Sequence, residues 1–134
     1  MMKTYHGSCH CGAVRFECEL DLAKGTSKCN CSACAKYRFW KAIVMADSFR
    51  LQQGAEALSD YQFGRHIIHH RFCRHCGTKP FGHANVEELG GAFYAVNVAC
   101  LDDATDEELA SAPVQYEDGR NDRWDAAPAK TRHL

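Results

Sequence analysis

The sequence lacks the features by which membrane, secreted and nucleic-acid-binding proteins are usually recognised. No segment approaches the run of about 20 apolar residues that a membrane-spanning helix needs, and residues 1–6 lack the apolar stretch of a signal peptide. The formal net charge of −1 and the absence of a basic run leave no field to attract nucleic acid or an anionic membrane. We therefore expect a soluble, cytoplasmic protein with no nucleic-acid or membrane partner, and nothing in the sequence predicts its oligomeric state.

Proline is scarce, with three residues, and the ten glycines form no low-complexity segment. No internal repeat or linker is visible, and 134 residues suffice for one domain with a modest core. We therefore predict a single domain over residues 1–134, of which residues 117–134 form a mostly polar C-terminal tail. This tail is either a surface segment held by Trp124 or a flap that closes a site, with Arg120 and Arg123 meeting an anion.

The hydrophobic pattern predicts a mainly β fold. Residues 13–20 alternate, with Val14, Phe16, Cys18 and Leu20 on one face, which is typical of a half-buried strand. Other short extended segments are expected at 40–46 (a more buried strand), 49–51, 59–63, 68–72, 92–100 and 114–116. One short helix is expected after Thr105, where Thr105 and Glu108 form a capping box, and Pro113 ends it. The class is thus several short antiparallel strands with one short helix.

Cysteine, by contrast, is abundant, with nine residues. Seven of them fall in three tight clusters: Cys9 and Cys11, then Cys29, Cys31 and Cys34, then Cys73 and Cys76. Such clusters indicate a disulfide framework in a secreted chain and a metal site in a reducing compartment. The odd count, the missing export signal and the close spacing within each pair all favour metal.

The two outer pairs predict a closed site. Cys9-x-Cys11 precedes the strand at 13–20, and Cys73-x-x-Cys76 follows the extended segment at 68–72. Gly77 can adopt the backbone conformation that closes the second turn. Four thiolates from two such turns complete a tetrahedral zinc site, and a closed site of this kind is mostly structural.

The middle cluster predicts an open site, because Cys29, Cys31 and Cys34 supply three sulfurs without a fourth cysteine beside them. Cys18 and Cys100 lie on apolar strand faces and are expected to be small buried residues. The fourth position is therefore left to water, a substrate or a histidine. The candidate histidines are His10, His66, His69, His70, His75 and His83.

Three thiolates suit zinc to sulfur chemistry, because they make it a weak Lewis acid that can hold an incoming thiol as a thiolate. Basic and aromatic side chains flank this cluster. The basic ones either offset its charge, hold a substrate carboxylate or form an ordinary solvated face, and the aromatic ones either pack against it or wall a substrate site. These residues are Lys28, Lys36, Arg38 and Lys41, and Phe39 and Trp40.

The clusters and their flanking residues resemble one known family. Residues 7–16 (GSCHCGAVRF), the Cys29-x-Cys31-x-x-Cys34 motif and residues 72–78 (FCRHCGT) are similar to the glutathione-dependent formaldehyde-activating enzyme (GFA) family. The resemblance covers about residues 5–100. It implies a GFA-type domain with an Mss4-like fold of short antiparallel sheets carrying zinc-binding cysteine knuckles.

The resemblance also implies ligands and substrates. In this interpretation Cys9, Cys11, Cys73 and Cys76 hold a structural zinc, and Cys29, Cys31 and Cys34 hold a functional zinc, which makes two Zn²⁺ per chain. The implied reaction joins formaldehyde to the thiol of glutathione, giving S-(hydroxymethyl)glutathione, and is classed as a carbon–sulfur lyase reaction run in reverse. The expected partners are therefore a small thiol and a small aldehyde.

Two hypotheses of different classes follow. In the first, the protein is an enzyme that adds a glutathione-like thiol to an aldehyde at the three-cysteine site; the sequence identifies no proton shuttle for this reaction. In the second, it is a non-catalytic, zinc-stabilised protein-binding module of the same fold, whose second zinc has a complete set of protein ligands.

Overall fold

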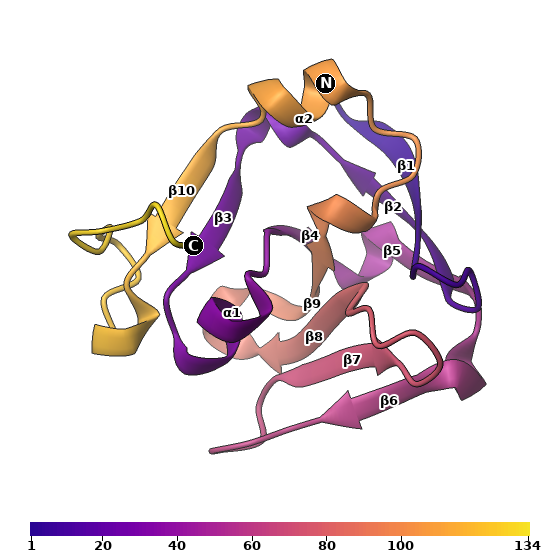
Figure 1. Cartoon of the computed structure of the whole chain (residues 1–134), viewed down its shortest axis with the longest axis horizontal. Helices are drawn as coiled ribbons and strands as arrows, with labels where there is room; N and C mark the ends of the chain where they lie inside the picture. The colour runs from indigo at the N-terminus through magenta and orange to yellow at the C-terminus, as the bar shows by residue number, and fades with distance from the viewer.

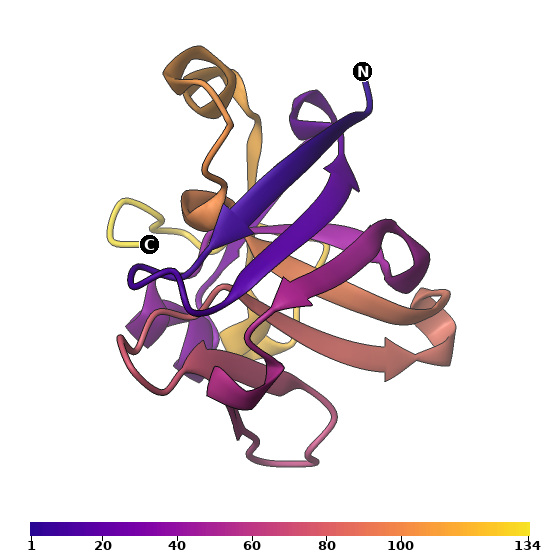
Figure 2. The ribbon, with the colours of Figure 1, turned by 90° about the vertical axis from the view of Figure 1, so that its right-hand side faces the viewer.

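A small sheet lies across a larger one in this protein, and the core is formed between them (Figures 1 and 2). The structure is a computed structural model that describes all residues, 1–134. The small sheet has the order β1-β2-β5 and is antiparallel. Its strands are β1 (Lys3–Ser8), β2 (Arg15–Leu20) and β5 (Phe49–Gln53).

The larger sheet has seven strands in the order β10-β3-β4-β9-β8-β7-β6. They are β3 (Thr26–Cys29), β4 (Lys41–Met45), β6 (Leu58–Tyr61), β7 (His69–Cys73), β8 (Phe81–Val86), β9 (Gly91–Asn97) and β10 (Val114–Glu117). All neighbours are antiparallel except β10 and β3, which are parallel. The mainly β prediction is confirmed, with this parallel pair as the exception, because the chain returns to the sheet through a helix rather than a hairpin.

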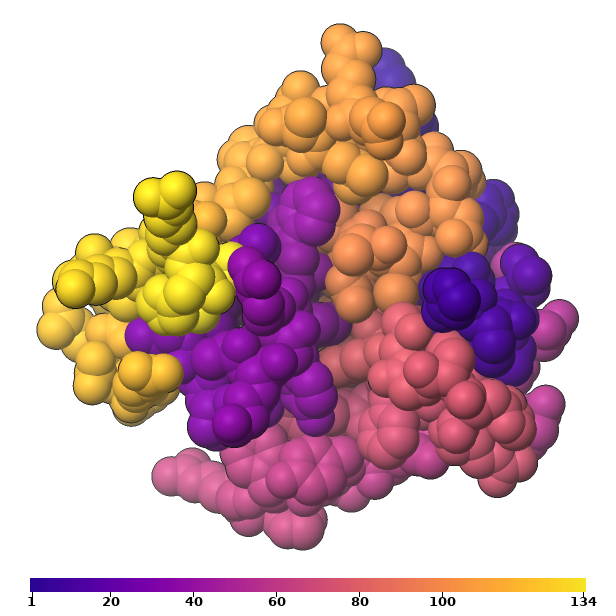
Figure 3. Space-filling view, in the orientation of Figure 1, coloured from indigo at the N-terminus to yellow at the C-terminus, as the bar shows by residue number.

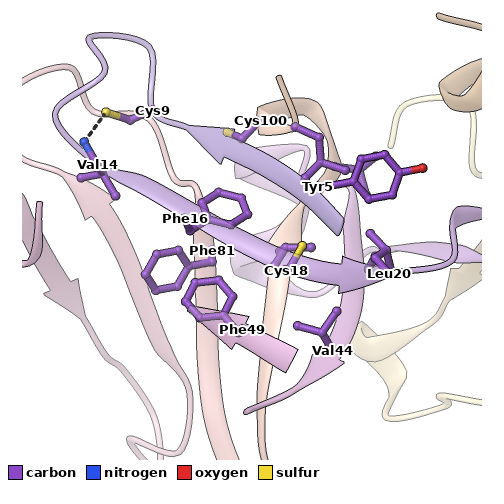
Figure 4. Packing of buried hydrophobic residues seen from close by; sticks show 14 of the residues in the cluster. Tyr5, Cys9, Val14, Phe16, Cys18, Leu20, Val44, Phe49, Phe81 and Cys100 are labelled. Atoms are coloured by element: carbon purple, nitrogen blue, oxygen red, sulfur yellow. Dashed lines mark hydrogen bonds between the residues drawn. The ribbon is translucent and has the colours of Figure 1, made fainter. Parts of the chain in front are cut away.

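The core is centred on β2, where the alternation predicted from the sequence is confirmed. Val14, Phe16 and Cys18 are fully buried. The ring of Phe16 stacks on Phe49 with centroids 5.4 Å apart and meets the edge of Phe81 at 6.0 Å. Figure 4 shows these three rings meeting beneath β2, so aromatic packing joins the two sheets at this point.

Two α-helices are present rather than the one expected. Helix α2 (Asp106–Ser111) has the predicted capping box: the N–H of Glu108 donates to Thr105 Oγ1 and the N–H of Thr105 donates to Glu108 Oε1, both at 3.0 Å. Helix α1 (Ser32–Tyr37) lies within the middle cysteine cluster and was not predicted. Six 3-10 turns complete the structure: Leu22–Lys24, Ala46–Ser48, Ala55–Ala57, Glu87–Leu89, Val98–Cys100 and Gly119–Asn121.

Two other predictions about individual strands were wrong in part. The segment at 40–46 was expected to be well buried, yet β4 alternates, and Ile43 and Met45 on its outer face are 48% and 38% exposed. The strand predicted at 92–100 ends at Asn97, because the Asn97 side chain accepts the N–H of Ala99 and starts a 3-10 turn. No helix in the structure has the length and apolar character needed to cross a membrane.

Candidate metal and thiol sites

The four outer cysteines meet at one point, although Cys11 and Cys73 are 62 positions apart in the sequence. The Sγ atoms of Cys9, Cys11, Cys73 and Cys76 all lie within 4.8 Å of one another. Cys11 Sγ is 3.7 Å from Cys9 Sγ and 3.7 Å from Cys73 Sγ. Zn–S bonds of about 2.3 Å place the sulfurs of a tetrahedral zinc site about 3.8 Å apart. This group could therefore hold a metal ion, and its spacing fits zinc.

Local hydrogen bonds fix the shape of the two cysteine turns and favour the thiolate form that binds a metal. The N–H of Val14 donates to Cys9 Sγ at 3.3 Å, as Figure 4 shows. In the second turn, the N–H of Gly77 donates to the carbonyl of Cys73 at 2.7 Å, and Gly77 has the positive φ (+78°) that this turn requires. The Thr78 hydroxyl beside Cys76 lowers the pKa of that thiol to about 5. A low thiol pKa favours the thiolate that a metal binds.

The position of this group makes it a clamp between the sheets. Cys9 and Cys11 lie in the turn between β1 and β2 of the small sheet, and Cys73 ends β7 of the larger sheet. Cys9 and Cys73 are buried, whereas Cys11 is exposed. A metal bound here would therefore fasten the two sheets together.

The middle cluster is built on a single turn. Cys29 ends β3, Cys31 caps the N-terminus of α1, and Cys34 lies inside that helix. The N–H of Cys31 donates to Cys29 Sγ and the N–H of Cys34 donates to Cys31 Sγ, each at 3.4 Å. Hydrogen bonds with the Cys29 and Cys34 thiols hold the pKa of Cys31 far below its ordinary value. The turn thus stabilises a thiolate at Cys31.

The three middle sulfurs are less closely gathered than the outer four. The outer set is the one group of three or more His, Cys, Asp or Glu side chains whose ligand atoms lie within 4.8 Å of one another. No histidine completes such a group with two of the middle cysteines. The donor set of three thiols suits zinc chemically, but its sulfurs would have to draw together, and the second zinc stays a prediction.

The C-terminal tail lies directly against the middle cluster (Figure 3). The N–H of Asn30 donates to the carbonyl of Glu117 at 3.2 Å, its side-chain amide donates to Asp118 Oδ1 at 2.8 Å, and its side-chain oxygen accepts the N–H of Arg120 at 2.9 Å. Trp124, in contrast, is 52% exposed, so Asn30 holds the tail in place rather than Trp124.

The tail and helix α1 together border a surface depression of about 590 Å³. Its lining residues are Cys31, Ser32, Ala35, Lys36, Gly119 and Arg120. The lining thus combines one cysteine of the cluster with two cationic side chains and has no acidic residue. Arg120 lies where a flap closing a site would place it, whereas Arg123 is not part of this lining.

Comparison with known proteins assigns the chain to a family. Residues 4–118 match the sequence profile of the glutathione-dependent formaldehyde-activating enzyme family. The chain belongs to this family. The match spans all three cysteine clusters, and the resemblance noted in the sequence is confirmed.

A solved structure supports the assignment of the GFA fold. The crystal structure of a Rhodobacter sphaeroides protein matches with a TM-score of 0.69 and 34% sequence identity. The match covers 82% of this chain and 99% of that one. The arrangement of sheets described above is therefore shared with an experimentally determined relative.

Most residues flanking the middle cluster of this GFA protein serve to hold it in place. Lys41 Nζ pairs with Glu117 Oε1 at 2.7 Å, which joins β4 to β10. The Trp40 indole N–H donates to Thr26 Oγ1 at 2.7 Å, so Trp40 packs rather than walls a substrate site. Lys28 Nζ donates to the carbonyl of Leu134 at 3.3 Å. Lys36 is the flanking cation that lines the depression.

The spare cysteines are buried and belong to neither cluster, as expected. Cys18 is fully buried and Cys100 is 7% exposed. Burial raises the pKa of each thiol to about 12. Both side chains are therefore neutral, apolar core residues at physiological pH.

Sequence reasoning missed a buried cation beside helix α1. Lys79 is 8% exposed, and its Nζ lies 2.7 Å from Nδ1 of His70, which is 5% exposed. The same Nζ lies 4.0 Å from the ring centroid of Phe39 and 4.6 Å from that of Tyr37. The only sequence signal was a lysine set between the second cysteine turn and the buried Pro80 and Phe81, which does not identify a partner.

Proposed function

We propose that this protein is a zinc-dependent enzyme of the carbon–sulfur lyase type. It adds the thiol of glutathione, or of a similar small thiol, to formaldehyde or another small aldehyde. The observation that carries the proposal is the middle cysteine turn, which opens on a depression bordered by Lys36 and Arg120 in a chain of the GFA family. Glutathione combines one thiol with carboxylate groups, and this lining offers a sulfur-binding centre next to two cations.

Two zinc ions per chain are proposed. Cys9, Cys11, Cys73 and Cys76 hold the structural ion, because their four sulfurs leave no position for a substrate. Cys29, Cys31 and Cys34 hold the functional ion. When bound, this ion supplies a soft centre that lowers the pKa of a thiol ligand.

The chain's own residues bind and orient the reactants. Lys36 and Arg120 attract the carboxylates of the thiol substrate and direct its sulfur toward Cys31. The backbone N–H groups that donate to Cys29 and Cys31 keep the turn in shape. The addition forms one C–S bond and turns the carbonyl into a hydroxyl group, and one proton passes from sulfur to oxygen.

Calorimetric titration of glutathione into protein shown to carry two zinc ions per chain tests this proposal. We expect saturable binding that disappears in Cys31→Ala and that S-methylglutathione, which has no free thiol, does not reproduce. Cys100→Ala is the matched control, because it removes a buried cysteine that belongs to none of the clusters and should keep the binding. Binding in Cys31→Ala equal to that of the wild type would contradict the proposed thiol site.

The second candidate is a zinc-stabilised protein-binding module without catalysis. It is favoured by exposed apolar side chains in and beside the loop between β6 and β7, namely Tyr61, Phe63, Ile67 and Ile68. Zinc-edge X-ray absorption separates the two candidates. An exchangeable oxygen beside three sulfurs at the second zinc supports the enzyme, whereas a complete set of protein ligands supports the module.

A further inference from the structure

Lys79 and His70 form a buried pair that the proposed thiol site does not use. Lys79 precedes β8, His70 lies in β7, and their nitrogens are 2.7 Å apart. Both side chains are more than nine-tenths buried. A lysine so deep in a protein normally pairs with a carboxylate, because burying an unpaired ammonium ion is costly.

No carboxylate compensates the charge of Lys79, since none of the ion pairs within 4.0 Å includes it. The Nζ atom instead faces the rings of Phe39 and Tyr37. Burial lowers the pKa of Lys79 to about 8; the thiolates of Cys34 and Cys31 oppose this shift, and Lys41 adds to it. At pH 7 roughly a tenth of the amine is therefore neutral, compared with fewer than about one in a thousand for an ordinary lysine.

His70 is placed to accept a hydrogen bond from the neutral amine and to relay its protons once the nitrogen has attacked a carbonyl carbon. Burial lowers its pKa to about 4, with Lys79 and His69 adding to the effect and Cys31 and Asp60 opposing it. The imidazole is therefore neutral at pH 7, and its Nδ1 is free to accept a hydrogen bond from Lys79 Nζ. Proton transfer between the two groups needs no movement of the backbone.

Aromatic side chains cover the pair on the side away from the core. Phe63 stacks on the His70 ring with centroids 5.5 Å apart, and the rings of Tyr37 and Tyr61 lie 5.8 Å and 6.2 Å from it. All three covering side chains are themselves more than 40% exposed. The pair thus lies beneath partly exposed aromatic side chains, in an apolar setting.

We propose that Lys79 is a nucleophilic lysine that captures a small aldehyde as an imine, with His70 as its proton acceptor. A desolvated lysine beside a base is the arrangement by which amines become nucleophiles toward carbonyl compounds. The choice of an aldehyde rests on the proposed function. The position fits that function, because Tyr37, which contacts Lys79, lies on the same short helix as Cys34.

The chemistry needs no redox partner. The amine nitrogen attacks the carbonyl carbon, a C–N bond forms, and the carbonyl oxygen becomes a hydroxyl group. His70 Nδ1 accepts a proton from the positively charged nitrogen and passes it to the oxygen, which gives that hydroxyl group. The second N–H proton follows the same route to the hydroxyl group, which leaves as water when the C–O bond breaks and the C=N bond forms. The net change is R–NH₂ + CH₂O → R–N=CH₂ + H₂O, and the reverse reaction releases the aldehyde.

Reductive trapping tests this proposal without measuring catalysis. Zinc-loaded protein is treated with limiting formaldehyde and cyanoborohydride at pH 7, and methylation of each lysine is followed over time by peptide mass spectrometry. A pKa of about 8 gives Lys79 a neutral fraction roughly 300-fold above that of an ordinary lysine. Because burial slows access, we expect Lys79 to react at least about tenfold faster than the exposed Lys24 and Lys130.

Two further measurements complete the test. The His70→Gln variant should lower the trapping rate of Lys79 at least about fivefold at pH 7 while leaving Lys24 unaffected, with circular dichroism verifying that the variant is folded. Benzaldehyde, a bulky aldehyde, should lose the preference for Lys79. Trapping of Lys79 no faster than that of Lys24 in the wild-type protein overturns the proposal, and an unchanged rate in a folded His70→Gln variant overturns the role of His70.

The outcome is independent of the thiol site. The trapping experiment contains no glutathione, so an unreactive Lys79 in a protein that binds glutathione would remove the imine alone. Reactive Lys79 in a protein that does not bind glutathione would leave the aldehyde chemistry standing and remove the proposed thiol substrate.

Discussion

Gly119 of the tail packs directly against the sulfur of Cys29. A methyl group built on Gly119 would lie 2.5 Å from Cys29 Sγ and 2.7 Å from the ring of Trp124. Cys29 cannot move aside, since it is buried at the end of β3, and the half-exposed ring of Trp124 would have to swing outward. The tail therefore packs against the middle cysteine turn, and a substitution in the tail should displace the sulfur of Cys29.

The Gly119→Ala substitution should accordingly weaken the thiol site more than the fold. We expect a loss of about 1–3 kcal/mol in the free energy of unfolding and a larger proportional loss of glutathione affinity, because the tail must move away from Cys29. Calorimetry and thermal unfolding measure the two effects. Gly64→Ala is the control without a steric clash: no atom lies within 4 Å of its added methyl group, and its φ of +59° adds a backbone cost of about 1 kcal/mol but should leave glutathione affinity unchanged. Unchanged glutathione affinity in Gly119→Ala would show that the tail does not shape the site.

Removal of metal from the outer site should loosen the whole molecule. Cys73→Ala takes away a buried sulfur that joins the larger sheet to the small one, and we expect it to lose one equivalent of zinc and at least about 3 kcal/mol of stability. Metal analysis and denaturant unfolding measure these losses. Cys100→Ala should keep both zinc ions and cost only about 1–2 kcal/mol. A chelator that strips the zinc without lowering the unfolding midpoint would contradict the structural role.

The two cations at the depression should contribute to thiol binding in a salt-dependent way. Lys36 and Arg120 are both exposed, and exposed ion pairs are worth about 0.2–1 kcal/mol each. Lys36→Ala and Arg120→Ala should therefore each weaken glutathione binding by about two- to fivefold, and the double variant by about tenfold. Lys24→Ala, which alters an exposed lysine outside the depression, should have no effect. Binding to the wild type should also weaken at high ionic strength, and a salt-independent affinity would argue against carboxylate recognition here.

Elements whose structure is set by residues close together in the sequence could be predicted from the sequence. The alternation of Val14, Phe16 and Cys18 identified β2, and the Thr105–Glu108 capping box identified α2. Strands β1, β3 and β8 were missed. Small residues such as Gly7, Gly82 and Ala84 occupy inward positions in β1 and β8 and remove the hydrophobic signal, and β3 is short and mostly polar. These strands form because neighbouring strands pair with them, and that pairing depends on the whole sheet.

In the candidate sites, too, local features could be predicted from the sequence and features set by tertiary packing could not. Close spacing within each pair was enough to predict the outer four-cysteine group, because a short turn fixes where two sulfurs point. The docking of the tail depends on Asn30, whose three hydrogen bonds reach residues almost ninety positions away. The pairing of Lys79 with His70 is set by the register of β7 and β8, and neither residue alone has a pattern that distinguishes it from a surface side chain.

The cost of burying Lys79 should appear as a pH-dependent penalty on stability. Its pKa in the folded protein, about 8, lies below the value of about 10.5 expected when unfolded. Between these values the unfolded chain holds the proton and the folded chain does not, so the wild-type protein gains stability as the pH rises from 8 to 10.5. Below pH 8 both states are protonated, and the penalty is present in full.

Lys79→Met removes this penalty and should therefore be more stable than the wild type near pH 7. We expect the difference in free energy of unfolding between Lys79→Met and the wild type to shrink by roughly 1–3 kcal/mol between pH 8 and pH 10.5. Denaturant unfolding of both proteins across this range measures it, with Lys24→Met as the control that shows no such trend. Parallel curves for Lys79→Met and the wild type would mean that Lys79 titrates like an exposed lysine. A converging pair of curves would mean that the fold keeps an unpaired buried amine at a cost in stability, and aldehyde capture gives a reason for keeping it.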